Sequence, residues 1–374
     1  MLYYIFAIII LFVCSNLRLN QKQTIAISFF LMLFLCFGYM TGSDWRSYEK
    51  YYEEGFTFKL VEPGYVLLSN LFAESGVNFW LFHILFKCIS FILTITFISK
   101  LSEKNNIFFA VMLWMASFGL YLYIDCPFRN LIAIGLSMVA FVFLLKKKYV
   151  YYYLLSLLAI TFHFSAIILL LLPIIRLERF SSGSLLATYF IVMAVLGFLG
   201  TNGIFSLISR FLPDIISQKV TYYEGAAEGS ILSLGSIPRL VCLFMIIGLR
   251  QKLTTSYRYG SIVFNFCYTY LIVSLIYYMI PMLFRSALFL APFYVFGIVY
   301  SLRLIKLSTR LVHKWCWLFL ALVITFSVAK SVYFVPYTNI LYNCVTGEFY
   351  DYNYRYNYNF NKSPFSNGHD DYED

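Results

Sequence analysis

Four basic side chains lie within or at the edge of long apolar runs, where an ionisable group is costly. They are Arg129 in CPFRN, His163 in ITFHFS, Arg239 in SIPRL and Arg285 in MLFRS. At membrane depth such a group must face protein, water or a ligand. Arginines that share a cavity suit phosphate, because the guanidinium donates several hydrogen bonds in one plane. We therefore take these four residues as candidates for an anion site.

Each of the three arginines follows a proline by one to four residues, at or near the predicted start of a span. A helix N-terminus adds backbone N–H donors and the positive end of the helix dipole. The combination predicts a pyrophosphate site. Any one arginine taken alone could instead extend along the membrane interface without binding a ligand.

His163 is the candidate general base. Its ordinary pKa lies near the working pH, so it could accept a proton from a sugar hydroxyl. A histidine that is hydrogen-bonded to a backbone carbonyl at a helix break is an equal alternative.

The polar stretch 41–65 supplies candidate sugar-binding residues. Asp44 and Glu62 flank it, and paired carboxylates can divide acid and base roles. Trp45 and Tyr48 lie between them, and aromatic faces stack on the C–H faces of sugars. Interfacial tyrosines are also common in membrane proteins for other reasons.

Several classes of function are excluded by pattern. No P-loop, GxSxG or HExxH motif occurs, and the eight cysteines show no metal-binding spacing. We expect no metal and no cofactor. The formal net charge of +10 comes mainly from short loops between apolar runs, where it sets orientation. Nucleic acid is not an expected partner.

The elements that must position these residues are membrane helices. The chain is 61% hydrophobic and 12% charged. Long apolar runs predict an all-α polytopic integral membrane bundle of about 11 to 12 spans. The runs cover 2–17, 24–40, 77–99, 107–124, 129–145, 149–175, 184–200, 234–249, 259–280, 284–302 and 315–335.

The run 149–175 decides the topology of everything after it. If it crosses once, the later basic clusters lie outside. If it folds as a hairpin with its break near His163, they all return to the cytoplasm, as the positive-inside rule favours. Each half, of about 12 to 14 residues, is short for a crossing. We therefore predict a re-entrant-like hairpin with His163 near the outer face.

The domain organisation follows from these runs. We predict a transmembrane domain over 1–343, with outer loops at about 41–76 and 201–233. Residues 344–374 are rich in Tyr, Asn and Asp and lack apolar periodicity. They are expected to form a disordered tail.

Six motifs in this order resemble the EpsG family of polysaccharide-biosynthesis membrane proteins, relatives of Wzy-type O-antigen and capsule polymerases. The resemblance covers roughly residues 38–342. The motifs are GSDWRSYEKYY, EPGYVLLSNLF, FRNLIAIGLSMVAF, LLAITFHFSAIILLLLPI, FRSALFLAPFYVF and VPYTNILY.

This resemblance implies a GT-C-like enzyme of the bacterial inner membrane that joins oligosaccharide units linked to undecaprenyl pyrophosphate at the periplasmic or outer face. By position Arg129 resembles the arginine that opens one of the family's spans, His163 the family's histidine and Arg285 its late arginine, and these three are our catalytic candidates. Asp44 and Glu62 match the family's first-loop acids. Arg239 matches less closely. The family also implies a separate chain-length regulator as a partner, and the lipid-linked oligosaccharide and the bilayer are the others.

Two other functions stay open at this stage. A flippase for lipid-linked oligosaccharides also needs internal arginines, but these should line the depth of a cavity between matched halves. A membrane O-acyltransferase of exported glycans needs its histidine on the cytoplasmic side.

Overall fold

The computed structural model describes residues 1–55, 62–102, 107–209, 234–277, 280, 283–331, 334 and 337–361. Within these residues every element is helical, and the single β-bridge joins Gly38 to Asn339. Among the described residues, six helices are long and apolar enough to cross a membrane, and five shorter helices are also apolar. The predicted all-α polytopic membrane fold is confirmed.

The chain forms two compact units, each described by itself. Unit 1 comprises Met1–Phe143, Tyr149–Phe164 and Ala321–Asp374. Unit 2 comprises Leu144–Lys148 and Ser165–Leu320.

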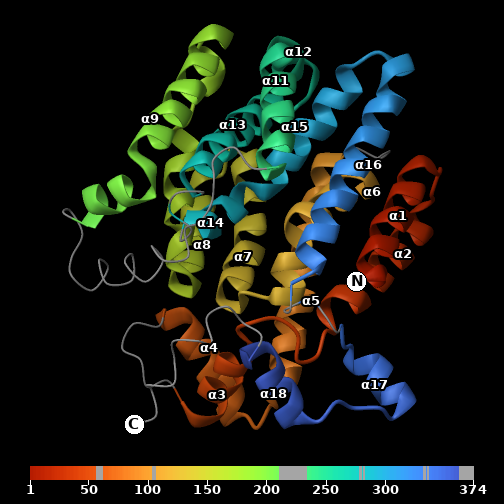
Figure 1. The fold of residues 1–374 in the computed structure, drawn as a ribbon. Coiled ribbons are helices and arrows are strands. Elements are labelled where there is room, and N and C mark those ends of the chain that lie inside the picture. Colours follow the sequence, from red (N-terminus) through yellow and green to blue (C-terminus); the bar gives the residue numbers. More distant parts are fainter. Residues whose placement is uncertain are drawn as a thin grey trace. The chain divides into compact units, whose positions relative to one another are not determined.

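Unit 1 contains six apolar helices that stand alongside one another (Figure 1). Helix α1 packs against α6, and α2 against α5. Their bounds are α1 Leu2–Asn16, α2 Gln21–Cys36, α5 Phe79–Ser102, α6 Ile107–Trp114, α7 Phe128–Leu145 and α8 Tyr149–Phe162. Helix α2 begins with a capping box between Asn20 and Gln23, which satisfies two backbone donors at its first turn.

Four further helices gather at one end of unit 1, where α2 ends and α5 begins (Figure 1). We call this the α3 end. The four helices are α3 Trp45–Glu54, α4 Pro63–Glu74, α17 Ile340–Thr346 and α18 Tyr352–Asn361. The predicted outer loop at about 41–76 therefore contains two short helices, α3 and α4.

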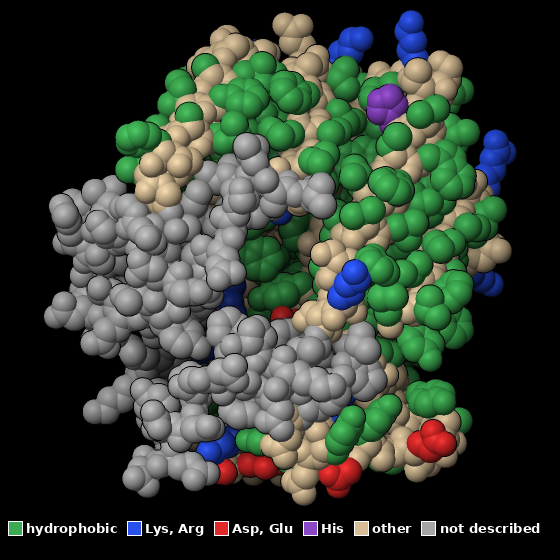
Figure 2. Space-filling view, viewed as in Figure 1, with side chains coloured by type: hydrophobic (Ala, Val, Ile, Leu, Met, Phe, Trp, Pro, Cys, Tyr) green, Lys and Arg blue, Asp and Glu red, His purple; other side chains and the backbone are tan. Residues whose placement is uncertain are grey.

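Basic and acidic side chains lie at different ends of unit 1. Arg18 lies between α1 and α2, Lys22 lies in the first turn of α2, and Lys100 lies in the last turn of α5, so all three lie at the end opposite α3. On the face in Figure 2, hydrophobic side chains cover the helices, and Asp and Glu gather around α3, α17 and α18. Within the described part of unit 1, these basic side chains and the acidic ones around α3 therefore lie at opposite ends.

The chain after α6 departs from regular α-helix in the residues that precede Arg129. Two π-helical turns, Met115–Gly119 and Tyr121–Asp125, follow it, and Cys126 has a left-handed φ of 54°. Turns of this kind often occur at functional sites. A Cβ on Gly42 would lie 2.3 Å from the Asp125 carbonyl oxygen, so only glycine lets the loop before α3 approach this closely.

The run 149–175 breaks at His163, as predicted. Helix α8 ends at Phe162, and a 3₁₀ helix covers Phe164–Ile174. At their respective rises per residue, the two segments are about 21 and 22 Å long. Each is shorter than a hydrocarbon core of about 30 Å.

Unit 2 is built around α13 (Gly260–Tyr277), which packs against α9 (Ser182–Ser209), α11 (Ile237–Gly248) and α15 (Ala291–Leu304). Smaller elements complete it: α12 Arg250–Ser256, α14 Phe284–Ala287 and 3₁₀ turns at Leu177–Arg179, Leu234–Ser236 and Leu288–Leu290. Helix α16, Leu307–Ala329, continues from unit 2 into unit 1. A Cβ on Gly297 would meet the Cys267 sulfur at 2.4 Å, so α13 and α15 cross in close contact.

Basic connectors also share one end of unit 2. Arg250 donates to the Phe180 carbonyl, which brings α12 beside the segment that carries Arg176 and Arg179. The Tyr257 ring stacks on Tyr300 with centroids 4.0 Å apart, which brings the end of α15 to the same place. The predicted grouping of these basic clusters is therefore present within unit 2, and α11 begins at the opposite end.

The C-terminal region differs from the disorder expected from residue 344. Residues 340–346 and 352–361 form α17 and α18, and Arg355 is only 1% exposed. Tyrosine rings and one arginine supply buried contact area that apolar periodicity does not reveal. The rest of the tail, 362–374, and most of the second predicted outer loop, 210–233, lie outside the described residues.

Candidate active site

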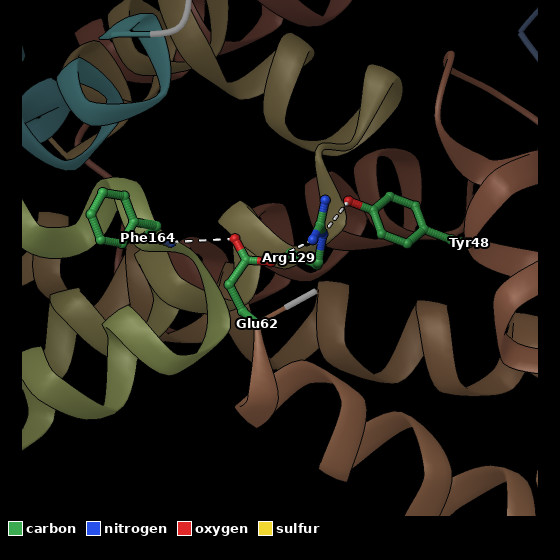
Figure 3. Close-up of polar contacts among 4 residues, drawn as sticks. All are labelled: Tyr48, Glu62, Arg129 and Phe164. Carbon is green, nitrogen blue, oxygen red and sulfur yellow. Dashed lines mark hydrogen bonds and ion pairs between the residues drawn. The ribbon is translucent and has the colours of Figure 1, made fainter. Parts of the chain in front are cut away.

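Arg129 is the centre of a polar cluster at the α3 end of unit 1 (Figure 3). Its Nη1 forms an ion pair with the Glu62 carboxylate, and the two side chains are 26% and 17% exposed. Its Nε donates to the Tyr48 hydroxyl at 3.3 Å, and the guanidinium carbon lies 5.9 Å from the Tyr48 ring centroid. The arginine is thus oriented by two partners and still reaches solvent.

Three elements place these side chains. Arg129 lies in the first turn of α7, directly after the irregular segment that ends at Cys126. Tyr48 projects from α3, where its ring packs edge-on against Tyr65 and Phe128 with centroids 5.7 and 5.9 Å away. Glu62 immediately precedes α4, which opens with a proline, a residue suited to the first helical position.

Glu62 also connects Arg129 to the break after α8. Its second oxygen accepts from the backbone N–H of Phe164 at 3.4 Å, so the start of the 3₁₀ helix faces this carboxylate (Figure 3). Helix α4 approaches α8 closely, because a Cβ on Gly64 would lie 2.3 Å from the Thr161 hydroxyl oxygen. His163 is half-buried one residue before Phe164, and its backbone N–H donates to Ala159.

Asp44 lies one helical turn before Tyr48. It shares the Ser43 hydroxyl with Asp125, a residue that the sequence analysis did not single out. The Ser43 hydroxyl lies 3.0 Å from Asp44 Oδ1 and 2.9 Å from Asp125 Oδ1, and the Ser43 N–H donates to Asp125 at 2.9 Å. Asp125 is four residues before Arg129, and this spacing in IDCPFRN was the available signal. Asp125 therefore fastens the N-terminal end of α3 through Ser43.

Trp45 is placed differently from the sugar-stacking role considered for it. It is 2% exposed, and its ring lies 5.5 Å from Trp80 and 6.0 Å from Tyr352 by centroids. A ring enclosed by other rings has no face left for a sugar. The structure favours packing for Trp45.

Unit 2 holds a second arginine–tyrosine pair. Arg239, at the start of α11, donates to the Tyr277 hydroxyl and to the Gly235 carbonyl, the latter at 2.9 Å. Its guanidinium carbon lies 5.3 Å from the Tyr277 ring centroid. Phe284 packs edge-on against Tyr277 at 5.2 Å, and half-buried Arg285 follows it in the chain. Arg239 and Arg285 thus belong to the same end of unit 2.

The predicted residues therefore divide between the units. Arg129, Glu62 and Tyr48 contact one another in unit 1, and His163 adjoins them along the chain. Arg239 and Arg285 belong to unit 2. A single site shared by all four basic residues stays a prediction.

These features define a polytopic helical membrane protein with arginine sites at helix starts. The model of the EpsG family matches residues 21–346, nearly the whole described membrane portion. The chain belongs to the EpsG family, whose members are Wzy-like polymerases. Searches of curated proteins and of solved structures gave no match.

Proposed function

We propose that this protein joins oligosaccharide repeat units carried on undecaprenyl pyrophosphate, at the outer face of the bacterial inner membrane. Family membership supports a polysaccharide polymerase in general. The proposed substrate and membrane face rest on one observation. Tyr48 and Glu62 hold Arg129 at the end of unit 1 opposite the basic connectors. An oriented arginine at that end suits a phosphate group delivered from the outer leaflet.

The reaction needs an anion site and a base. A hydroxyl of one unit attacks the anomeric carbon of the other, and a new C–O bond forms. The bond from that carbon to the pyrophosphate oxygen breaks, and its electron pair leaves with the lipid pyrophosphate. The hydroxyl proton passes to a basic side chain.

Arg129 would stabilise the departing pyrophosphate. Glu62 contacts one side of the guanidinium, and Tyr48 accepts from its Nε. Phosphate oxygens compete for the same Nη donors, because they match the guanidinium fork as a carboxylate does. Tyr48 would keep the arginine oriented while its other partner changes.

Exchange of partners at Arg129 would also release the base. Once the pyrophosphate replaces Glu62 at Arg129, the Glu62 carboxylate no longer has the guanidinium as its counter-charge. It then lies beside the leaving group and can accept the hydroxyl proton. His163, adjacent to the Phe164 N–H that faces Glu62, is the second candidate for this role. Each reaction involves two lipid pyrophosphates, one per repeat unit, and Arg239 with Arg285 would bind the other one.

The test is the surface polysaccharide made by cells with Arg129→Ala or Arg239→Ala. We expect loss of the long-chain ladder on gels, while single repeat units still reach their acceptor. Arg258→Ala is the matched control, because Arg258 is exposed at the opposite end of unit 2. Loss of single units as well would favour a flippase, and unchanged ladders in both variants would refute the proposed sites.

A further inference from the structure

Within unit 1, the C-terminal region of the chain makes a series of contacts with the N-terminal region. Asn339 forms a β-bridge with Gly38, and the Tyr39 N–H donates to the Thr338 carbonyl at 3.1 Å. These contacts fasten the chain after α16 to the segment between α2 and α3. They bring the following residues to the α3 end.

Arg355 on α18 is the next fastening point. Its Nη2 donates to the Met40 carbonyl at 2.5 Å, and its guanidinium carbon lies 5.7 Å from the Tyr350 ring centroid. The side chain is 1% exposed. Burial of a guanidinium is costly unless its partners are in place, so the Met40 carbonyl and the Tyr350 ring tie this side chain to the docked position of α18.

Glu49 joins α18 to α3 itself. Its Oε2 accepts from the Tyr352 hydroxyl at 2.7 Å, and its Oε1 accepts from Trp80 Nε1 at 2.8 Å. The carboxylate is 7% exposed. One buried side chain of α3 is therefore held by α18 on one oxygen and by α5 on the other.

Arg46 completes the contact. It donates to the Tyr356 carbonyl at 2.7 Å, and its guanidinium carbon lies 4.6 Å from the Tyr356 ring centroid. Helix α3 has only ten residues, and helices of this length are marginal in water without tertiary contacts. Contacts from α18 to Arg46 and Glu49 thus fix the helix that presents Tyr48 to Arg129.

We propose that α18 is a clamp that positions α3, and through it Tyr48 and Arg129, with Glu49, Tyr352 and Arg355 as positioning residues. The inference rests on the proposed function of Arg129. Helix α18 lies beyond residue 346, where the family match ends, so family membership does not supply it.

The first test measures the clamp without using activity. In full-length protein in lipid nanodiscs, hydrogen–deuterium exchange is followed in peptides that cover α3. Tyr352→Phe and Arg355→Ala should each speed exchange in α3 about fivefold or more, because local opening becomes easier. Tyr354→Phe is the control, since Tyr354 is 53% exposed on the same helix. Unchanged exchange in both test variants would overturn the clamp.

The second test asks whether the clamp acts through Tyr48. With lipid-linked repeat units from the producing cells as substrate, Tyr48→Phe and Tyr352→Phe should each lower kcat about tenfold. The double variant should be no slower than Tyr48→Phe alone, because coupled residues are not additive. If the two losses in kcat multiply in the double variant, α18 only stabilises the fold. Separately, Arg355→Lys should restore part of the rate lost in Arg355→Ala.

The two proposals fail separately. If the wild-type protein forms no polymer while α3 exchange responds to Tyr352→Phe, the polymerase proposal fails, and α18 still positions α3 and Tyr48. If polymer forms normally in Tyr352→Phe and Arg355→Ala, the positioning role is refuted and the polymerase proposal is unaffected.

Discussion

At the scale of the residue, the candidate site depends on which N–H groups of Arg129 contact which partners. Nε is committed to Tyr48 and Nη1 to Glu62, from two different helical elements. A lysine has one compact charge and cannot hold both partners in a fixed plane. The geometry of the guanidinium, beyond its charge, is therefore what we expect the reaction to require.

Arg129→Lys tests this geometry. It keeps the charge but loses one oriented hydrogen bond to a charged group, worth about 1.5–3 kcal/mol. We expect polymerisation to fall by roughly one to two orders of magnitude, measured as chain-length distribution and rate on lipid-linked units. A lysine variant as active as wild type would show that charge alone is sufficient.

Glu62→Gln should separate binding from turnover. Glutamine keeps the shape but no longer competes with phosphate for Arg129, so lipid pyrophosphate should bind more tightly. Turnover should fall, because the amide cannot accept the hydroxyl proton. Titration of lipid pyrophosphate and kcat on the same protein check the two effects, and a parallel loss of both would argue for a purely structural ion pair.

At the scale of the element, the contact between α4 and α8 places Glu62. Gly64 allows it, because any Cβ there would enter the space of Thr161. The Phe164 N–H, where the 3₁₀ helix begins, is brought to Glu62 by the same contact.

Gly64→Ala should therefore push α4 away from α8. We expect a destabilisation of about 1–3 kcal/mol from overpacking, seen as a lower Tm in detergent, together with reduced polymer. Gly183→Ala is the matched control, because nothing lies within 4 Å of a Cβ built there. Thr161→Ala in the same chain should recover part of the loss.

The α18 contact should also depend on pH. Burial raises the pKa of Glu49 above its ordinary value, the nearby Glu53 adds to this, and hydrogen bonds from Tyr352 and Trp80 oppose it. A raised pKa means that the docked state holds its proton longer than the undocked state. Docking is then strongest at acidic pH and weakens as pH rises from the ordinary value through the raised one.

Exchange in α3 and α18 measured across this range should rise with pH after correction for intrinsic exchange. Glu49→Gln should flatten the dependence, because it removes the titrating group. Arg46, the basic neighbour on α3, does not titrate in this range. A slope that survives in Glu49→Gln would assign the dependence to another group.

At the scale of the whole molecule, each unit keeps its basic connectors at one end and an arginine–tyrosine pair at the other. For each unit taken by itself, the positive-inside rule predicts that the connectors lie in the cytoplasm. For the connectors after residue 175, this prediction depends on the break at His163.

Cysteine accessibility checks this topology. In a chain whose exposed Cys316 and Cys344 are replaced by serine, Glu53→Cys should react with a membrane-impermeant thiol reagent in intact spheroplasts. Leu177→Cys should react only after the membrane is permeabilised. Labelling of position 177 from outside would show that the run 149–175 crosses once.

The sequence alone determined the features that depend on local composition. Apolar runs set the helices, and the polar interruption around His163 marked the break. Loop charges predict the orientation of the helices in the membrane. Tertiary structure alone decided which side chains meet: Arg129 and Tyr48 are separated by 81 positions, and no periodicity reports such a pairing. It also buried Trp45 and docked α18, because both depend on aromatic contacts between distant segments that have no local signature.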